Sequence, residues 1–396
     1  MDPYFTPPSP ILPSDPTFSS ASISLQGPAF DTLLRRIAEL APETDVEGDF
    51  PVNAFAELAG AGLLAVTLPG GPLDFARPTT PQLLKLLKRI GGANLAVGRV
   101  YEGHINALYL IHLYASPDQR ARWYTEVRAH HHLFSVWNTQ AGDGIGIDRT
   151  DAGHYRLRGS KTFCSGAGWI ERPLITGEIQ TENRRGWQMA IVPTERVLPI
   201  RQDDQFWKPL GMRASASFKM DFTDVELSET DLLGHPGEYL RQPYFSGGAI
   251  RFAAVQLGGA EAIYEATRQF LMSMGRTDDV LQRTRLAEMA YLIESGNQWL
   301  RSAGEKTDAW LAEGADWTTV VAYANMTRTA IEEICLRVMP LAERCVGARG
   351  LLRPQAFERI HRDLTMYLRQ PAPDATLVDI GQYVLTNSLP AHDLWR

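Results

Sequence analysis

The sequence predicts an α+β protein in which a helical domain is followed by a small β domain and then by a bundle of longer helices. Three changes along the chain predict this order. Apolar residues recur at helical spacing up to about residue 129, short extended runs broken by Gly, Asp and Pro fill 133–227, and helical spacing returns over 244–369. We therefore expect domains at 28–131, 132–236 and 237–396, after a flexible N-terminal segment at 1–27.

The first domain is predicted from two amphipathic segments. In each, apolar residues repeat every three or four positions, which places them on one face of a helix. These residues are Phe30, Leu33, Leu34, Ile37 and Leu40, and then Phe55, Leu58 and Leu63. The Pro-Gly-Gly sequence that begins at Pro69 predicts a turn after the second segment.

The other two domains are predicted from different patterns. Runs such as His-Tyr-Arg-Leu-Arg-Gly at 154–159 and Gln-Met-Ala-Ile-Val-Pro at 188–193 indicate short strands between turns. The expected core positions of the third domain are Ile263, Phe270, Leu286, Met289 and Leu292. Small residues at Ala253, Ala254, Gly258 and Gly259 predict that neighbouring helices approach closely there.

Composition excludes several classes of function. Of the 396 residues 44% are apolar and 21% charged, and the formal net charge is −7 without a basic run, which argues against nucleic-acid binding. No stretch of about twenty apolar residues predicts a membrane span, and no signal peptide is expected. The three cysteines fit no metal-ligand spacing, so we expect reduced thiols in the cytoplasm. The histidines at 130–132 cannot share one helical face, so no metal site is expected.

Three motifs, in a fixed order, point to one family. The first is Tyr-Arg-Leu-Arg-Gly-Ser-Lys-Thr-Phe-Cys-Ser-Gly-Ala at 155–167. The second is Gly-Met-Arg-Ala-Ser at 211–215, with Phe-Thr-Asp-Val-Glu-Leu at 222–227. The third is Cys-Val-Gly-Ala-Arg-Gly at 345–350, with His-Arg-Asp-Leu-Thr at 361–365. Together they resemble the acyl-CoA dehydrogenase superfamily of flavoproteins. The resemblance implies a β-barrel-like central domain, a C-terminal four-helix bundle and an FAD-dependent oxidoreductase.

The resemblance also implies where a flavin binds. Family members read the ring edge with two β segments, here 134–138 and 163–165. The candidate residues are Phe134, Val136, Trp137, Asn138, Phe163 and Ser165. A hydroxyl near the ring stabilises charge that arrives on reduction, and an aromatic side chain packs against the ring. Ser165 and Phe163 are suited to these two roles.

A second group of candidates would contact the pyrophosphate and adenine of FAD. The family uses an Arg and a Gln of the bundle and a glycine loop for this purpose. The nearest matches are Arg276, Gln282, Gly347, Arg349 and Gly350, although the spacing from Arg to Gln is shorter than usual. Arg offers charge-assisted bonds to phosphate, and Gly lets backbone amides come close. Because the family completes this site with a neighbouring subunit, the resemblance implies a homodimer or homotetramer.

The chain departs from the family at the catalytic base. The family usually places a Glu after the Arg-Asp pair, and counting from Arg362 and Asp363 this position falls on Pro371. Some members carry the Glu just before an Arg of an earlier helix, where this chain has Ile250 before Arg251. An Asp that meets the pantetheine chain is replaced by Gly248. Three features of an acyl-CoA dehydrogenase are therefore absent together.

Three interpretations follow. The chain is a dehydrogenase with another base, the candidates being Glu102, His104 and Asp374. Alternatively, it is a monooxygenase or N-oxygenase that uses reduced FMN or FAD, with Arg369 where related turns carry His. A third hypothesis is a flavin-binding subunit without activity. The partner would be an electron-transfer flavoprotein for the dehydrogenase and a flavin reductase for the oxygenase.

Substrate recognition is predicted on a helix of the first domain. Tyr101, Glu102 and His104 form a polar cluster before an apolar run. His104 is suited to proton transfer because its pKa lies near neutrality, whereas the alternative is a histidine satisfied between helices. Tyr101, His104 and Arg251 are the candidates for binding a small-molecule substrate.

Overall fold

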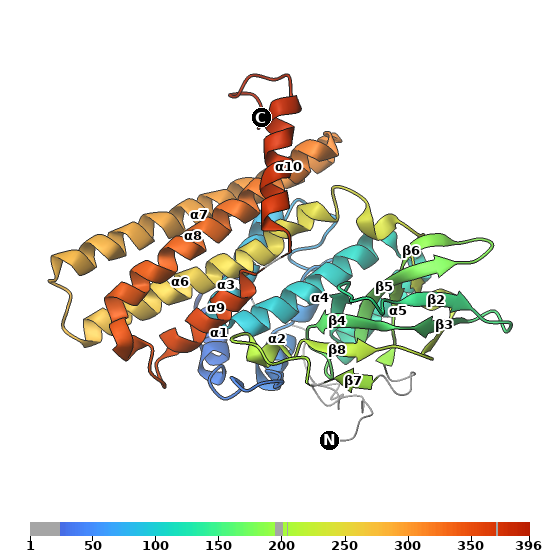
Figure 1. Ribbon diagram of the computed structural model, residues 1–396, viewed down its shortest axis with the longest axis horizontal. Coiled ribbons are helices and arrows are strands. Elements are labelled where there is room, and N and C mark those ends of the chain that lie inside the picture. The colour runs from blue at the N-terminus through green and yellow to red at the C-terminus, as the bar shows by residue number, and fades with distance from the viewer. Residues whose placement is uncertain (1–23, 195–200, 204, 370) are drawn as a thin grey trace. The chain divides into compact units, whose positions relative to one another are not determined.

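The computed structural model describes residues 24–194, 201–203, 205–369 and 371–396, so most of the predicted N-terminal segment lies outside the described residues. The chain forms two compact units. The first contains residues up to Ala76 together with Arg99–Pro209 and Arg213–Arg241. The second contains Arg77–Gly98, Leu210–Met212 and Gln242–Arg396. The predicted order of helices, sheet and helices is confirmed (Figure 1).

The helices of the first unit are amphipathic or buried, as their sequences predict. They are α1 (Pro28–Leu40), α2 (Val52–Gly60), most of α4 (Leu95–Tyr114), and α5 (Pro117–His130). In α1 the predicted face of Phe30, Leu33, Leu34 and Ile37 is buried. Helix α5 begins at Ser116, which forms a capping box with Gln119 and so satisfies two backbone amides of the first turn.

Two sheets complete the first unit. The larger contains β1 (Phe134–Trp137), β2 (Gly146–Arg149), β3 (Tyr155–Arg158), β5 (Arg172–Gln180), β6 (Arg185–Ile191), β9 (Glu226–Leu227) and β10 (Leu232–Leu233). Its strands run in the order β10-β6-β5-β2-β3-β9, and β1 pairs in parallel with the start of β5. The smaller sheet has the order β4 (Ser160–Cys164), β8 (Phe218–Asp221), β7 (Arg201–Asp203). Strands β3 and β6 confirm the two runs predicted from the sequence.

The second unit is a helical bundle. Its elements are α3 (Thr80–Ala93), α6 (Ala249–Ser273), α7 (Val280–Glu313), α8 (Trp317–Gly350), α9 (Ala356–Tyr367) and α10 (Pro373–Thr386). Helices α6, α7 and α8 lie side by side, and α10 crosses α8 and projects from the bundle (Figure 1). None of the helices in the described part of the chain is both long and apolar enough to cross a membrane.

The closest helix contact of the bundle occurs at the predicted small residues. A Cβ atom built on Gly258 would lie 2.0 Å from the backbone oxygen of Lys88, and one on Gly91 would lie 2.5 Å from that of Val255. Helices α3 and α6 therefore pack backbone to backbone, which only glycine permits at these positions. Of the predicted core residues, Ile263, Met289 and Leu292 are buried, whereas Phe270 and Leu286 are half-buried.

Candidate functional site

The two β segments predicted to contact a flavin lie together in the first unit. The indole nitrogen of Trp137, the last residue of β1, donates a hydrogen bond of 3.0 Å to the backbone oxygen of Ser165. Trp137 is 2% exposed, so this bond is shielded from water. This bond joins residues 134–138 to residues 163–165, which a hairpin separates in the sequence, and we call these two segments together the candidate edge.

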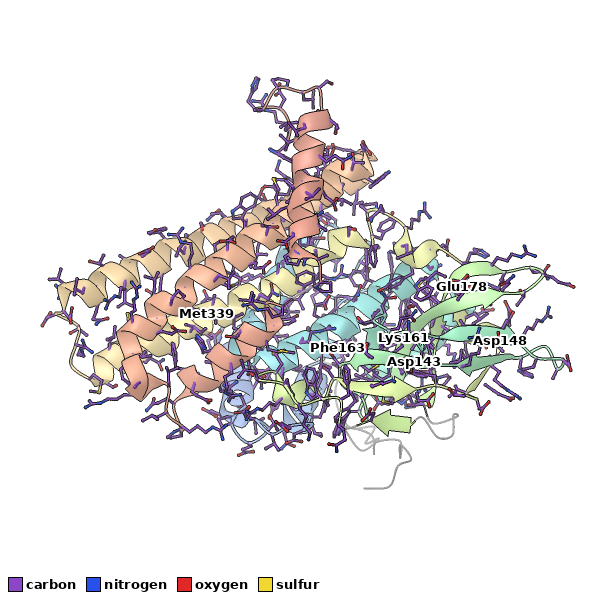
Figure 2. All side chains as sticks on the ribbon, in the orientation of Figure 1. Asp143, Asp148, Lys161, Phe163, Glu178 and Met339 are labelled. Atoms are coloured by element: carbon purple, nitrogen blue, oxygen red, sulfur yellow. The ribbon has the colours of Figure 1, made fainter. Side chains whose placement is uncertain are left out.

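Phe163 has an unusual backbone at this edge. Its φ is +54°, a left-handed conformation that costs a bulky residue on the order of 1–2 kcal/mol. The pairing of β4 with β8 shifts register between Lys161 and Cys164, which marks an irregularity at the same place. Phe163, which Figure 2 labels, is 48% exposed. Its ring meets that of Phe206 edge-on, with 5.1 Å between the ring centroids. The strained backbone therefore turns an aromatic side chain outward.

Three serine hydroxyls support this edge from behind. Ser165 Oγ lies 2.9 Å from Ser217 Oγ, which lies 2.8 Å from Ser215 Oγ. The backbone follows the same route, because the amide of Gly166 donates to the oxygen of Ser215 at 2.8 Å. Ser215 ends the Gly-Met-Arg-Ala-Ser motif, so that motif holds the strand end that carries Ser165. Ser217 was not predicted, although its place two residues after the motif was a usable signal.

Lys161 is a second residue that the sequence did not indicate. Its side chain is fully buried and its Nζ donates to Asn138 O at 2.9 Å, Gln140 Oε1 at 2.7 Å and Thr176 Oγ1 at 3.1 Å. Thr176 Oγ1 in turn donates to Asn138 Oδ1 at 2.6 Å. Burial lowers the pKa of Lys161 to about 8. This network fixes Asn138, the last residue of the predicted flavin-contacting segment.

His104, a candidate for proton transfer, is fully buried and bonded on both ring nitrogens. Nε2 lies 2.9 Å from Leu64 O, and Nδ1 accepts from the backbone amide of Phe134 at 3.1 Å. These partners require the neutral tautomer with hydrogen on Nε2. Burial lowers the pKa of His104 to about 4. The contacts favour the interpretation that His104 positions β1 between helices.

The two neighbours of His104 are also engaged. The Tyr101 hydroxyl donates to Leu63 O at 2.6 Å, and burial raises its pKa. Glu102 forms an ion pair of 3.4 Å with Arg99. A substrate-binding role for Tyr101 and a catalytic role for Glu102 stay predictions.

The candidates for pyrophosphate contact lie at one end of the bundle. Arg276 pairs with Asp279, the N-cap of α7, at 3.3 Å. The side-chain amide of Gln282 is oriented with its oxygen toward two arginines. Gln282 Oε1 accepts hydrogen bonds from Arg276 at 3.2 Å and from Arg285 at 3.3 Å. The structure therefore brings Arg276 and Gln282 together despite their short spacing.

The predicted glycine loop is instead a kink within α8. Gly347 has φ 58° and ψ −164°, a conformation that breaks the helical backbone. Gly350 is buried and Arg349 is exposed. Arg285, which bonds Gln282, lies 3.5 Å from the backbone oxygen of Arg344 just before the kink. The two groups of candidates from α7 and α8 are thus neighbours within the second unit.

The position expected for a catalytic Glu is bonded to the side chain of Arg328. The oxygen of Pro371 accepts from Arg328 at 2.6 Å, and Arg328 also donates to Thr376 at 3.3 Å. Asp374 is exposed in the first turn of α10, whose N-cap is Ala372. Arg369 is exposed as well. The structure gives neither residue a contact that assigns it to catalysis.

Arg251 fills the space beside Gly248, the position at which the resemblance predicts an Asp. A Cβ atom built on Gly248 would lie 2.7 Å from an Arg251 guanidinium nitrogen. Arg251 is 9% exposed. A side chain at position 248 would displace this guanidinium. The position of Arg251 therefore depends on the glycine at 248.

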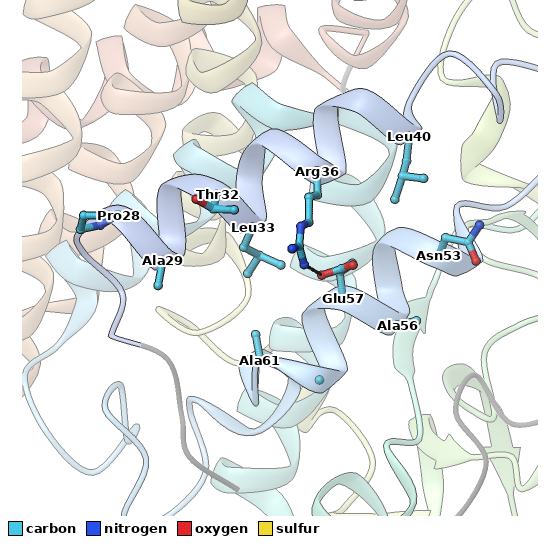
Figure 3. Close-up of a pocket in the computed structure, with 11 residues that line it drawn as sticks. Pro28, Ala29, Thr32, Leu33, Arg36, Leu40, Asn53, Ala56, Glu57 and Ala61 are labelled. Atoms are coloured by element: carbon cyan, nitrogen blue, oxygen red, sulfur yellow. Dashed lines mark ion pairs between the residues drawn. The ribbon is translucent and has the colours of Figure 1, made fainter. Parts of the chain in front are cut away.

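A groove in the first unit lies apart from these residues in the sequence. It has a volume of about 960 Å³ and runs between α1 and α2, where Arg36 pairs with Glu57 at 3.5 Å (Figure 3). Pro28, Leu33 and Ala61 also line it. None of the predicted site residues does.

Comparison with known proteins places this geometry in context. A family model described as the C-terminal domain of acyl-CoA dehydrogenase matches residues 250–368, which span α6 to α9. Dibenzothiophene monooxygenase of Rhodococcus qingshengii is 23% identical over 386 residues, covering 88% of this chain and 90% of that protein.

Solved structures of two activities share the fold. FMN-bound TdsC from Paenibacillus sp. A11-2 matches with a TM-score of 0.80 at 18% identity, covering 92% of this chain and 99% of that one. Butyryl-CoA dehydrogenase from Megasphaera elsdenii matches with a TM-score of 0.75 at 18% identity, covering 92% and 100%.

Proposed function

We propose, since the chain belongs to the acyl-CoA dehydrogenase superfamily, that it is a flavin-dependent monooxygenase acting on a small organic molecule. One observation carries the proposal. The two positions at which the superfamily places its base are Pro371 and Ile250, and the backbone oxygen of Pro371 is bonded to Arg328. A dehydrogenase needs a carboxylate to remove the α-proton, whereas oxygen insertion does not need that group.

The edge formed by β1 and the end of β4 is suited to a flavin ring. Phe163 offers an exposed aromatic side chain, and Trp137 of β1 bonds the backbone of Ser165 two residues later. The hydroxyls of Ser165, Ser217 and Ser215 form a buried chain behind this edge, and Ser217 also donates to the backbone oxygen of Ser215 at 3.4 Å. Reduced flavin supplies the electrons that activate dioxygen for transfer to the substrate.

The chain's own residues would hold this edge rigid and dry. Lys161 fixes Asn138, His104 fixes the amide of Phe134, and Trp137 joins the two segments. Each of these side chains is buried, so water is excluded from the back of the edge. Rigid support of this kind preserves the geometry of a bound cofactor.

Arg276 and Gln282 support FAD as the cofactor in preference to FMN. An Arg beside a buried Gln matches the polar surface of a second phosphate, which only FAD carries. If the site binds FAD, Arg276→Ala should weaken FAD binding about tenfold, equal to about 1.4 kcal/mol, and leave FMN binding unchanged. Arg268→Ala is the matched control, because Arg268 is exposed and pairs with Glu265.

A dehydrogenase with another base is the second candidate. Asp374 lies three residues after Pro371 and is exposed, which supports its availability as a base. The protein would then pass electrons to an electron-transfer flavoprotein, whereas a monooxygenase would receive reduced flavin from a reductase. We also propose a cytoplasmic location, supported by three free, buried cysteines, and assembly into a homodimer or homotetramer.

One experiment separates these alternatives. Purified protein is mixed with photoreduced FMN or FAD, and oxygen consumption and flavin reoxidation are followed by stopped flow. A monooxygenase should bind reduced flavin and alter its reoxidation. In parallel, oxidised holoprotein is mixed anaerobically with acyl-CoA thioesters. Bleaching of the flavin by a thioester would overturn the monooxygenase proposal, and absence of any flavin affinity would overturn both.

A further inference from the structure

Two titratable side chains hold consecutive backbone amides where the chain enters β1. The amide of Leu133 donates a hydrogen bond of 2.8 Å to Glu171 Oε2. The next amide, that of Phe134, donates to His104 Nδ1 at 3.1 Å. Strand β5 begins beside them, since the amide of Arg172 donates to Leu133 O at 3.1 Å. All of these residues are buried, so the start of the candidate edge depends on Glu171 and His104 for its hydrogen bonds.

The carboxylate of Glu171 is buried with little to balance its charge. Glu171 is 9% exposed, and within the described part of the chain its carboxylate forms no ion pair. The guanidinium of the neighbouring Arg172 bonds the backbone oxygen of Glu171 and the carboxylate of Glu126 instead. Burial of an unpaired carboxylate is costly, so it raises the pKa of Glu171 to about 7.

The charged and titratable groups of this cluster come from several elements. They are Arg122 and Glu126 of α5, the three histidines at 130–132, Arg172 of β5 and Asp231 just before β10. Arg122 pairs with Asp231 at 3.1 Å and with Glu126 at 3.3 Å. Glu126 pairs in addition with Arg172. Among these described groups two carboxylates are matched by two guanidinium groups, and the carboxylate of Glu171 is left over for a proton to neutralise.

We infer that Glu171 is a positioning residue that couples proton release to flavin binding, because its ionised carboxylate holds the amide of Leu133 and thereby the candidate edge. This role rests on the proposed function, in which residues 134–138 meet the flavin ring. A hydrogen bond to an ionised acceptor is about twice as strong as one to a neutral acceptor. Protonation of Glu171 therefore loosens the start of β1.

Flavin affinity should rise as pH increases through about 7. Glu171 is protonated below this pH and ionised above it. The difference between a charged and a neutral acceptor corresponds to a change of about fivefold in affinity. His104, whose pKa burial lowers to about 4, does not change its state in this range, so the amide of Phe134 stays bonded. Because linkage is reciprocal, flavin binding should also release protons between pH 6 and 7.

Fluorescence titration of the full chain with FAD, from pH 6 to 8.5, tests the coupling. We expect the wild-type Kd to fall about fivefold between pH 6 and 8. Glu171→Gln keeps an oxygen for the amide of Leu133 but cannot ionise, so its affinity should stay at the weak level and differ little with pH. Glu178→Gln, at an exposed position of the same strand, is the matched control and should follow wild type. Parallel profiles of wild type and Glu171→Gln, or a wild-type affinity that falls with pH, would overturn the inference.

Infrared difference spectra between pH 6 and 8 separate failure of this coupling from failure of the proposed function. Wild type should lose a carboxylic-acid band that Glu171→Gln lacks. Flavin binding without this band would overturn the inference alone, whereas the band without flavin binding at any pH would overturn the coupling together with the proposed function.

A second variant keeps the coupling testable if Glu171→Gln does not fold. The charge of a protonated His132 favours the ionised form of Glu171. His132→Gln should therefore move the midpoint of the affinity profile to higher pH, and circular dichroism verifies that its helices are kept. An unchanged midpoint in His132→Gln would contradict the assignment of the profile to Glu171.

Discussion

The Trp137 indole nitrogen lies 3.0 Å from the backbone oxygen of Ser165 and donates a hydrogen bond to it. Trp137 closes β1 and Ser165 follows β4, so one side chain joins two strands of different sheets. Phe163 lies two residues before Ser165, so this bond restrains the backbone next to the exposed side chain. The contact thereby connects the packing of the first unit to the proposed flavin edge.

Replacement of Trp137 by Phe should weaken both folding and flavin binding. The variant loses a buried hydrogen bond and part of a ring, which together cost about 2 kcal/mol of unfolding free energy. We expect flavin affinity, measured by fluorescence titration, to fall several-fold. Trp317→Phe is the control, since Trp317 is half-exposed in the second unit. Equal flavin affinity in wild type and Trp137→Phe would show that the bond serves folding alone.

Two substitutions of Phe163 should separate backbone strain from ring contact. Both Phe163→Gly and Phe163→Ala remove the ring, but only Gly adopts φ +54° without strain. We expect Phe163→Gly to be about 1 kcal/mol more stable than Phe163→Ala in denaturant unfolding. Both should bind flavin equally weakly. If the alanine variant bound flavin as wild type does, the ring would have no part in the site.

The helices and strands could be predicted because burial imposes their periodicity on the sequence. The face of Phe30, Leu33 and Ile37 is buried in α1, and Ile263 is buried in α6. The close contact at Gly258 was also predictable, since adjacent small residues in a long helix have few other uses.

The support of the candidate site could not be predicted, because it depends on contacts between distant residues. His104 bonds Leu64, 40 residues away, and Phe134, 30 residues away, so its spacing alone left two interpretations open. Lys161 lies in a short strand where a lysine is normally exposed. Only the folded arrangement of Asn138 and Thr176 around it explains its burial.

His104 should make the protein less stable in acid. Its pKa in the folded protein is about 4, whereas an unfolded histidine titrates near 6.5. The unfolded chain therefore binds the proton first, and the contribution of His104 to the unfolding free energy falls as pH decreases from 6.5 to 4, by up to about 3 kcal/mol. This fall should be smaller in His104→Ala, in which His112 and His131, whose pKa values are also lowered by burial, still contribute.

Substitution of His104 should also act at neutral pH. In His104→Ala, Leu64 O and the amide of Phe134 lose their partner, and we expect a loss of about 3 kcal/mol of unfolding free energy. His392→Ala, an exposed histidine, is the control. Chemical denaturation at several pH values measures both effects. A wild-type profile that runs parallel to that of His104→Ala would contradict the buried neutral state.

Lys161 should give a pH dependence of the same sign, but at alkaline pH. The pKa of Lys161 is about 8 in the folded protein, and an unfolded lysine titrates near 10.4. Between these values the unfolded chain binds more protons, so the contribution of Lys161 to the unfolding free energy rises with pH, by about 3 kcal/mol at most. Below pH 8 both states are protonated and no slope is expected. Lys161→Met should lose the alkaline rise, whereas Lys85→Met, at an exposed lysine of α3, should keep it.

Because Lys161 holds Asn138 in place, Lys161→Met should also bind flavin several-fold more weakly at pH 7. Unchanged flavin binding in this variant would show that the Lys161 network does not support the flavin edge.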